Sequence, residues 1–452
     1  MERYKKYKDS GVEWIGEIPS EWDVKKLKCF ISKAGSGITP RGGASVYQLT
    51  GIPLLRSQNI HFGGLKLDDV AYITQEIHDE MSNSKVFSGD ILLNITGASI
   101  GRCYYVTDSL GEANVNQHVC ILRPIKKFST EFLYFILRSD IGQEQINFEQ
   151  TGSGREGLNF EALKNFLIPS IGLDEQTAIA NYLDRKTAQI DKLIAQKERL
   201  IELYEEEKTA IINRCVTKGI DPDVRLKDSG IDWLGDIPEG WEVKKLKFLI
   251  SNLESGVSVN STDFPASDQS YGVLKTSCVY KYVFEPCENK EIWQSELIRA
   301  KIKPRKGEII ISRMNTPELV GASGYVDKDF EYLYLPDRLW QTVFKIGVKI
   351  DTKWLSYVLK SIRFRMLLSI TAKGASPSMK NLTQEDFLKI TVPFPDLDEQ
   401  IAIVYRIKTE IAFINAKIAK TKKIIELQKE YRTALISEVV TGKIKVTREA
   451  AS

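Results

Sequence analysis

The stretch that decides the fold is KDSGVEWIGEIP at residues 8–19, because it returns as KDSGIDWLGDIP at residues 227–238. When residues 8–32 are aligned with residues 227–251, 16 of 25 positions are identical and five more exchange similar side chains. An internal repeat of this kind indicates that one structural unit occurs twice. Its period of about 220 residues is far longer than that of a solenoid. The sequence therefore predicts two tandem copies of a whole domain.

A second repeated block begins with the tetrapeptide LDEQ, at residues 173–176 and again at residues 397–400. Each copy follows a proline closely, and the match continues without a gap to TAII at 209–212 and TALI at 433–436. Aspartate is a good N-cap, and acidic residues are favourable near the positive end of a helix dipole. The pattern predicts two long helices, with Asp174 and Asp398 as their N-caps.

Apolar residues recur along both predicted helices at close to heptad spacing, which is typical of a coiled-coil seam. Each stripe could instead pack on its own globular domain. Pairing of the two stripes is favoured, because neither long helix can bury its seam alone. The predicted seam residues are Ile190, Ile194, Ile201, Ile211, Ile414, Ile418, Ile425 and Ile436.

The segments between the repeated blocks, residues 33–165 and 252–389, share almost no sequence. Both contain short apolar runs bounded by Gly, Ser, Asn and Thr, such as DILLN at 90–94 and EIIIS at 308–312. That texture predicts a mixed α/β domain of the α+β class with several strands. The two copies thus keep one scaffold and differ in what it presents.

Composition excludes several classes of protein. The chain has 452 residues, with 63 Lys and Arg against 60 Asp and Glu, so a site for a polyanion must be a local patch. No apolar run resembles a signal peptide or approaches the roughly 20 residues of a membrane span. Six cysteines without a CxxC pair predict buried free thiols in a reducing cytoplasm, and only three histidines speak against a His-rich metal site.

Catalytic motifs are nearly absent from the sequence. GSGREG at residues 152–157 satisfies GxGxxG, but no strand pattern precedes it and the aligned segment 376–381 keeps none of its glycines. A flexible loop therefore explains it better than a Rossmann turn. There is no GxxxxGK[ST] phosphate loop and no GxSxG elbow. The sequence predicts no catalytic, cofactor-binding or metal-binding residues.

Polar side chains on glycine-rich turns occur in parallel places in both divergent segments. Such turns suit close approach to base edges and phosphates. Taken singly, each residue is more simply part of a turn, but their parallel placement favours a DNA-reading surface. The candidates in the first segment are Ser36, Thr39, Arg41, Arg56, Ser57, Gln58, Asn59, Asn116, Gln117, Ser153 and Arg155. Those in the second are Ser258, Asn260, Lys275, Thr276, Arg313, Asn315, Arg338, Gln341, Lys373 and Ser376.

The doubled KDSGxxWxGxIPxxW opening, the LDEQ helix starts and the TA(I/L)I…VT helix ends resemble the specificity subunit of type I restriction-modification enzymes. The likeness covers essentially the whole chain. It implies target recognition domains at residues 1–165 and 223–390, and helix regions at residues 166–222 and 391–452.

The resemblance implies a non-catalytic, cytoplasmic subunit whose two domains each read half of a bipartite, asymmetric site on double-stranded DNA. The helices would form an antiparallel coiled coil with pseudo-twofold symmetry, in which residues 186–217 and 410–441 act as a spacer and dock two methyltransferase subunits. Those partners would use S-adenosylmethionine to methylate adenine N6. Motor-nuclease subunits that use ATP and Mg would join for restriction, and this chain would hold no cofactor.

Two other interpretations remain open at this point. The chain could serve a combined restriction-methylation enzyme of a different type, which the neighbouring genes would reveal. It could also be a coiled-coil adaptor that does not bind DNA, which would show no salt-dependent DNA binding. The near-neutral charge further predicts weak DNA binding without the methyltransferase partners.

Overall fold

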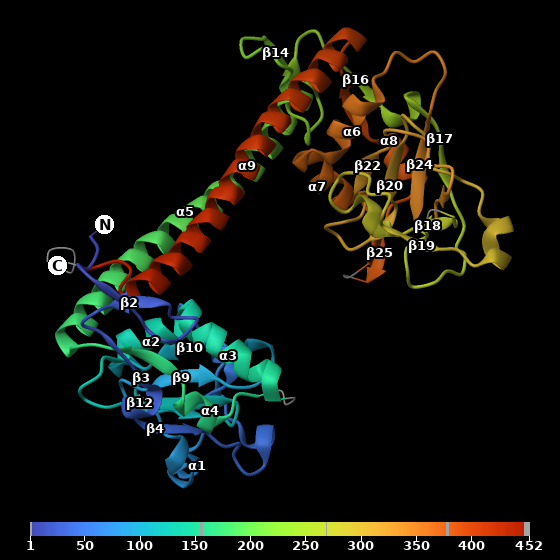
Figure 1. Ribbon diagram of the computed structural model, residues 1–452. Helices are drawn as coiled ribbons and strands as arrows, with labels where there is room; N and C mark the ends of the chain where they lie inside the picture. Colours follow the sequence, from blue (N-terminus) through green and yellow to red (C-terminus); the bar gives the residue numbers. More distant parts are fainter. Residues whose placement is uncertain (1, 154–156, 268, 377–378, 447–452) are drawn as a thin grey trace. The chain divides into compact units, whose positions relative to one another are not determined.

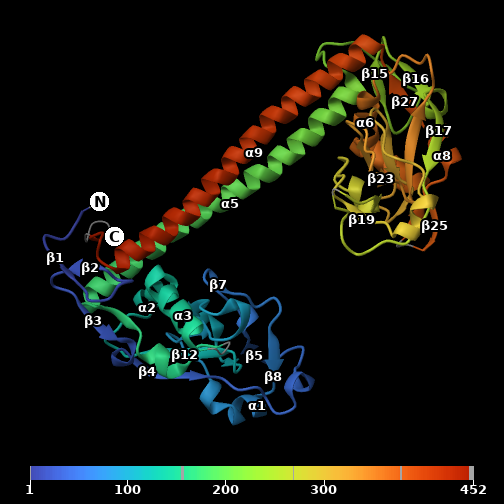
Figure 2. The same ribbon diagram turned by 45° about the vertical axis from the view of Figure 1, so that its right-hand side comes forward.

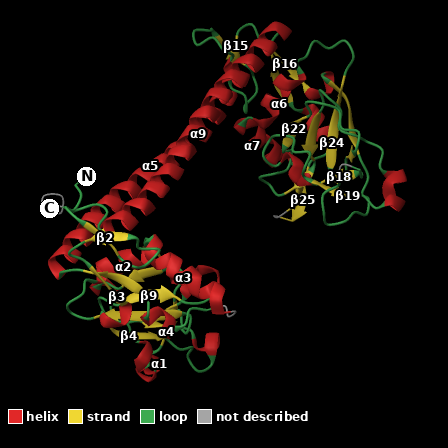
Figure 3. Ribbon diagram, viewed as in Figure 1, coloured by secondary structure: helices red, strands yellow, loops and turns green. Residues whose placement is uncertain are grey.

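The computed structural model describes residues 2–153, 157–267, 269–376 and 379–446, without the side chains of 151–153 and 375–376 (Figure 1). The chain divides into two compact units. The first unit comprises Met1–Glu198 and Lys422–Ser452, and the second comprises Arg199–Thr421. Each unit combines helices and strands with part of the two longest helices (Figure 3).

The first unit has its strands gathered into one larger sheet and several small ones. The strands are β1 (Tyr7–Asp9), β2 (Glu17–Pro19), β3 (Asp23–Lys26), β4 (Ile31–Ser36), β5 (Ile52–Leu55), β6 (Ile60–His61), β7 (Gly64–Leu65), β8 (Ala71–Ile73), β9 (Ile91–Asn94), β10 (Cys103–Tyr105), β11 (Asn114–Val115), β12 (Val119–Pro124) and β13 (Leu167–Ser170). The helices are α1 (Gln75–Glu80), α2 (Thr130–Arg138), α3 (Asp140–Ser153), α4 (Phe160–Lys164) and the first part of α5 (Leu173–Lys218). The larger sheet is antiparallel in the order β10-β9-β12-β4, and a smaller one has the order β11-β5-β8.

The second unit repeats this arrangement. Its strands are β14 (Leu226–Asp228), β15 (Asp236–Pro238), β16 (Glu242–Lys245), β17 (Ile250–Ser255), β18 (Gly272–Leu274), β19 (Asn289–Glu291), β20 (Ile309–Ser312), β21 (Met314–Asn315), β22 (Ser323–Tyr325), β23 (Leu333–Tyr334), β24 (Leu339–Phe344), β25 (Lys373–Ser376), β26 (Met379–Asn381) and β27 (Thr391–Phe394). Its helices are α6 (Thr352–Lys360), α7 (Ile362–Thr371), α8 (Gln384–Lys389) and the first part of α9 (Leu397–Val440). The larger antiparallel sheet has the order β22-β20-β24-β17.

The two larger sheets share one topology although their sequences diverge. The apolar runs at residues 90–94 and 308–312 contain β9 and β20. Each of these strands lies inside its sheet and is buried at all four positions. A strand covered on both faces needs a continuous apolar run in place of alternation. The mixed helix and strand class predicted for both segments is therefore confirmed.

The two long helices are α5, with 46 residues, and α9, with 44. In the first unit their segments run in opposite directions, since Asp191 forms an ion pair with Arg432 and Glu198 lies 4.0 Å from Lys429. In the second unit the α5 and α9 segments also lie side by side, with the Lys417 ammonium 5.4 Å from the centre of the Tyr204 ring (Figure 2). Two long antiparallel helices are therefore part of both units.

The seam residues named above are all turned away from full solvent exposure. Ile201 and Ile211 are half-buried, and Ile211 packs against the core of the second unit. The remaining six are buried: Ile190, Ile194, Ile414, Ile418, Ile425 and Ile436. The apolar stripe thus serves both helix packing and, at its end, the core of a globular domain.

The predicted N-caps are both wrong by two residues. Both helices begin at the leucine of LDEQ, so Asp174 and Asp398 lie in the first turn. Their carboxylates still favour the helix N-terminus there. In α9 the capping contact comes from Asp396, whose Oδ1 accepts a hydrogen bond of 2.9 Å from the backbone N–H of Glu399.

The glutamine of LDEQ anchors each long helix to its domain. The Oε1 of Gln176 accepts from the backbone N–H of Ser129, and that of Gln400 from Asp351, both at 2.8 Å. Ser129 and Asp351 are the N-caps of α2 and α6. Each glutamine also donates to the backbone carbonyl five residues earlier, at 2.9 and 2.8 Å. Both glutamines are buried, so every polar atom of the side chain is used inside the protein.

Within each unit, the other long helix also contacts the domain. The backbone N–H of Asp140, at the start of α3, donates to the hydroxyl of Ser437 on α9 at 3.2 Å. The backbone N–H of Ile362, at the start of α7, donates to Oδ1 of Asn213 on α5 at 2.8 Å. Each domain is thus held by one residue from each long helix.

The repeated opening packs against the ends of the long helices. Its second tryptophan, Trp22 or Trp241, is buried beside the glycine that follows a helix, Gly442 after α9 and Gly219 after α5. Both glycines have φ near +74°, the left-handed conformation typical of a helix C-terminal cap. The indole N–H of Trp241 also donates to the carboxylate of Glu399, the glutamate of the second LDEQ, at 2.8 Å. In the second unit the two repeated blocks are therefore in direct contact.

Three smaller expectations can be checked against the fold. Four cysteines are buried free thiols, but Cys29 and Cys287 are exposed, so the expectation of six buried thiols is wrong for these two. The residues before the GxGxxG pattern form α3 and not a strand, as the rejection of a Rossmann turn requires. Across the described ranges, each helix is either too short or too polar to cross a bilayer.

Candidate nucleic-acid interface

In each unit one glycine shapes the first loop of the candidate surface. A Cβ on Gly37 would lie 1.7 Å from the carbonyl oxygen of Val115, and one on Gly256 would lie 1.6 Å from that of Leu335. No other residue fits at such a distance. These glycines hold the loop after β4 or β17, which carries several candidates, against the segment that precedes β12 or β24.

In the first unit, side chains from three loops form one hydrogen-bonded chain. The Thr39 hydroxyl donates to Oε1 of Gln117, whose Nε2 lies 3.0 Å from Nε2 of His118. Nδ1 of His118 lies 2.6 Å from the hydroxyl of Thr96. With the Gln117 amide donating to Nε2, a neutral ring carries its proton on Nδ1 and donates to Thr96. Sequence reasoning did not place Thr96 in the site, because its contribution depends on a contact between loops.

Asn116 positions the residues of this hydrogen-bonded chain. It is buried, and its Oδ1 accepts from the backbone N–H of His118 at 3.1 Å. This local hydrogen bond shapes the turn that presents Gln117 and His118. Asn116 is thus a positioning residue, whereas Thr39 and Gln117 are exposed.

The run Arg56–Asn59 is partly used within the protein. Asn59 is 2% exposed, accepts from the backbone N–H of Arg56 at 2.9 Å and donates to the carbonyl of Lys66 at 2.9 Å. Gln58 donates to the carboxylate of Asp69 at 2.6 Å, and Arg56 donates to the Asp69 carbonyl at 3.0 Å. Asn59 therefore has no free polar atom, while the exposed Gln58 would have to exchange a weak surface contact to reach a base.

Ser57 joins this run to the end of the central strand. Its carbonyl accepts from Nδ2 of Asn94, the last residue of β9, at 2.8 Å. The Oδ1 of Asn94 is buried, and none of the described residues forms a hydrogen bond with it. The loops after β5 and β9 thus meet at one end of the domain.

In the second unit three cationic residues lie on neighbouring backbone segments at the corresponding strand ends. The backbone N–H of Arg313 donates to the carbonyl of Arg338 at 3.1 Å, and the β21–β26 ladder pairs Asn315 with Lys380. None of Arg313, Arg338 and Lys380 has a carboxylate within ion-pair distance among the described residues. We call these three the cation cluster. Lys380 was missed by sequence reasoning, because only the strand pairing places it opposite Asn315, two residues from Arg313.

Asn315 and Thr276 are linked through a tyrosine. Nδ2 of Asn315 donates to the Tyr280 hydroxyl at 2.8 Å, and that hydroxyl lies 2.9 Å from the hydroxyl of Thr276. The loop after β18 is thereby joined to β21, much as the loops after β5 and β9 are joined in the first unit.

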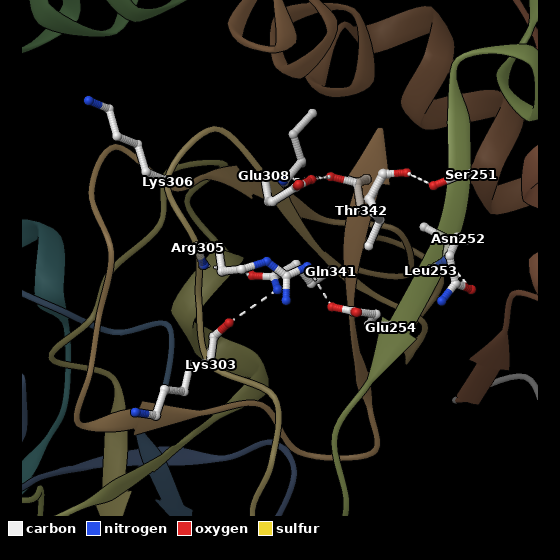
Figure 4. Close-up of polar contacts among 12 residues, drawn as sticks. Ser251, Asn252, Leu253, Glu254, Lys303, Arg305, Lys306, Glu308, Gln341 and Thr342 are labelled. Atoms are coloured by element: carbon white, nitrogen blue, oxygen red, sulfur yellow. Dashed lines mark hydrogen bonds and ion pairs between the residues drawn. The ribbon is translucent and has the colours of Figure 1, made fainter. Parts of the chain in front are cut away.

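Gln341 must be removed from the candidates. It lies on β24, is fully buried, accepts from the backbone N–H of Arg305 at 3.0 Å and donates to the carbonyl of Lys303 at 3.1 Å (Figure 4). No polar atom of its side chain remains for a base. The neighbouring surface is an ionic network in which Arg305 pairs with Glu254 at 2.6 Å.

An acidic residue before the central strand is bound in both units. Asp90 receives two hydrogen bonds from the Arg123 guanidinium, at 2.7 and 2.8 Å. Glu308 accepts from the Thr342 hydroxyl at 2.8 Å (Figure 4). Burial raises the pKa of Glu308, against the lowering effects of this hydrogen bond and of the nearby Arg305 charge. These contacts fix the strands that they join.

The remaining candidates are divided between paired and unpaired side chains. Lys275 forms an ion pair with Glu288 at 2.8 Å, and Lys373 with Asp386 at 3.3 Å. Asn260 is exposed and donates to Glu296 at 3.2 Å, and Ser36 is half-buried. Arg41 and Ser258 are exposed. Ser153 and Ser376 lie at the ends of α3 and β25 without a described side chain, and Arg155 lies outside the described residues.

A sequence model of the family described as "Type I restriction modification DNA specificity domain" matches residues 19–203 and 238–429. The chain belongs to this family. The two matches fall on the two copies of the repeat. A curated relative is the putative type I restriction enzyme MjaX specificity subunit of Methanocaldococcus jannaschii, 24% identical and aligned over 96% of each chain. Another is the type I restriction enzyme EcoKI specificity subunit of Escherichia coli K12, 22% identical, over 94% of this chain and 91% of that one.

Solved structures share the fold. A chain from a study of complex assembly and conformational transition of the type I R-M system superposes with a TM-score of 0.66, at 16% identity, over 94% of this chain and 99% of its own. The HsdS subunit from Thermoanaerobacter tengcongensis gives a TM-score of 0.55 at 17% identity, over 94% and 98%. The resemblance drawn from the doubled motifs is confirmed: this is a non-catalytic specificity subunit for DNA sequence recognition in a type I restriction-modification system.

Proposed function

We propose that each unit of this specificity subunit reads one half of a bipartite DNA site. In this proposal α5 and α9 form the spacer and dock two methyltransferase subunits that methylate adenine N6, and motor-nuclease subunits join for restriction. The observation that carries the proposal is that one sheet topology occurs twice. In both units a glutamine makes the same contact between a long helix and the domain, whereas the loops differ in chemistry. A shared scaffold with different loops suits two different half-sites.

The two surfaces are suited to different contacts. In the first unit Thr39, Gln117 and His118 offer hydrogen-bond donors and acceptors of the kind that read base edges. In the second, the cation cluster suits phosphate oxygens and guanine edges. The proposed recognition domains are residues 1–165 and 223–390, and the proposed helix regions are 166–222 and 391–452.

A domain exchange tests the division of labour. Residues 33–165 are replaced by the matching segment of another specificity subunit, and the chain is co-expressed with its methyltransferase. Long-read sequencing of host DNA then maps N6-methyladenine. The expected result is a change in one half-site, with the other half-site and the gap retained. A change in both half-sites would refute independent reading.

The spacer role has its own test. Deleting four residues from one long helix removes about one turn, or roughly 5.4 Å, and should alter the permitted gap by about one or two base pairs. An unchanged gap with unchanged half-sites would count against the spacer.

Salt dependence tests the cation cluster. Arg338→Ala and Lys380→Ala should each reduce the salt slope of DNA binding by about one counterion. Lys373→Ala is the matched control, because Lys373 is already paired with Asp386. Equal slopes for all three variants would remove the cluster from the interface.

A further inference from the structure

A cavity of about 720 Å³ lies within the second unit, and DNA reading gives it no role. Its walls come from the α5 and α9 segments of this unit, the end of α6, helix α7, and two loops at residues 281–283 and 317–318. It therefore lies where a recognition domain meets its long helix.

Two cations in this cavity, Lys360 and Arg365, lack a carboxylate partner among the described residues. Lys360 is half-buried. The ammonium of Lys360 at the end of α6 lies 4.1 Å from the centre of the Tyr357 ring, and no carboxylate of the described residues pairs with it. Burial lowers the pKa of Lys360 to about 8, and the charges of Lys353 and Lys208 act in the same direction. Burying an unpaired charge is costly, so such a group is normally matched by an opposite charge.

The other lysines around the cavity are matched in that way. Lys208 pairs with Glu205 at 2.7 Å, and Lys281 pairs with Glu285 at 2.8 Å. Lys360 alone among these three is left with only an aromatic ring for its charge.

An apolar stripe runs beside the cavity along α7. Ile362, Met366 and Ile370 are 46%, 62% and 82% exposed, and their spacing of four places them on one face of the helix. Ile362 and Met366 line the cavity itself. Contiguous exposed apolar side chains, with methionine and arginine nearby, are typical of protein–protein interfaces.

We propose that this cavity and the α7 stripe dock a segment of the methyltransferase subunit, which places an aspartate or glutamate carboxylate against Lys360 and apolar side chains along Ile362, Met366 and Ile370. The proposal rests on the function proposed above. The partner's carboxylate supplies the charge that the second unit lacks, and its apolar residues cover the stripe. A DNA phosphate backbone would account for the lysine but not for the stripe.

The first unit offers a related cation. Arg138 ends α2 where Lys360 ends α6, and the flanking sequences FILRS and YVLKS align. The guanidinium of Arg138 already donates to the Tyr134 hydroxyl at 2.8 Å. A cation at the same place in both copies fits one docking contact in each unit.

The test uses the full-length chain and the purified methyltransferase subunit, with affinity and stoichiometry measured by calorimetric titration. Lys360→Glu should weaken binding at one of two sites at least 30-fold. Lys353→Glu is the matched control and should stay within twofold of wild type. Lys353 lies on the same helix, 4.9 Å from the Tyr325 ring, but does not line the cavity.

Lys360→Met separates docking from folding. It removes the charge without adding a carboxylate, so it should lose docking like Lys360→Glu while raising the melting temperature of the isolated chain. Wild-type binding by both Lys360 variants would overturn the docking site and leave the proposed function intact. Failure of the wild-type chain to bind the methyltransferase would overturn both. A loss of DNA affinity with unchanged methyltransferase binding would assign Lys360 to DNA and also overturn the proposal.

Discussion

Replacing Gln400 by methionine should reveal why the LDEQ block is repeated. The side chain is buried and joins α9 to the N-cap of α6 by accepting from the backbone N–H of Asp351 at 2.8 Å. It also donates to the carbonyl of Pro395, just before α9, at 2.8 Å. Methionine has a similar length and no amide. The variant would leave one buried donor and one buried acceptor without partners.

The expected cost follows from those two orphaned groups. A buried polar group that loses its partner costs about 1–3 kcal/mol, so the free energy of unfolding should fall by about 2–4 kcal/mol. Gln176→Met in the first unit should cost a similar amount, since Gln176 makes the same two contacts. For a domain of this size, the drop corresponds to about 5–15 °C in Tm.

Urea denaturation followed by circular dichroism measures this loss. Ile401→Met is the matched control, because Ile401 is the next residue and is half exposed, and it should change the free energy of unfolding by less than about 0.5 kcal/mol. A cost below 0.5 kcal/mol for both glutamine variants would show that the contacts do not anchor the helices.

The stability of Gln400→Glu should depend on pH. In Gln400→Glu, a protonated carboxyl could still donate to the Pro395 carbonyl and accept from Asp351, whereas a carboxylate would face that carbonyl without a proton. Burial would then raise the carboxyl pKa in the folded state, and the stability it contributes is lost as pH rises through that value. The deficit of Gln400→Glu relative to wild type should therefore be smaller at about pH 5 than at about pH 8.

Three further predictions concern stability. Asp90→Ala removes the carboxylate partner of the Arg123 guanidinium, which is 30% exposed, and should lower the free energy of unfolding by about 3 kcal/mol in urea titrations. A cost under about 1 kcal/mol would contradict the pairing. Because the pKa of Lys360 is lowered to about 8 by burial, the unfolded chain keeps that proton longer, so stability should rise by up to about 3 kcal/mol between pH 8 and 10.5 and this rise should vanish in Lys360→Met. Gly256→Ala would place its Cβ 1.6 Å from the Leu335 carbonyl, so it should lower Tm by several degrees and impair methylation at one half-site, and an unchanged Tm would refute the close approach.

The features that sequence predicted well are those fixed by local pattern. Heptad spacing located α5 and α9, and the burial of Ile414 and Ile418 agrees with the stripe. Apolar runs located β9 and β20 because a buried strand needs side chains of one kind on both faces. The repeat itself indicated that one topology occurs twice, which the two larger sheets show.

The features that sequence could not predict depend on contacts distant in the chain. Gln341 and Asn59 have the same residue types as a base-reading side chain, and only the fold shows that backbone groups occupy them. Lys380 reaches the cation cluster through a strand pairing that its own sequence does not announce. The N-cap error has a local cause, because Asp396 precedes LDEQ and competes with Asp398 for the same role.

The distribution of repeated and divergent sequence has one physical explanation. The repeated residues contact one another: the LDEQ glutamate Glu399 meets Trp241 of the opening, and Gln400 meets the start of α6. A change at any of these positions leaves a buried partner unpaired, so the blocks can vary only together. Residues such as Thr39 and Arg338 contact little that the scaffold needs. Their loops can therefore change the DNA sequence that is read at small cost in stability, while the contacts that join each domain to its helices stay as they are.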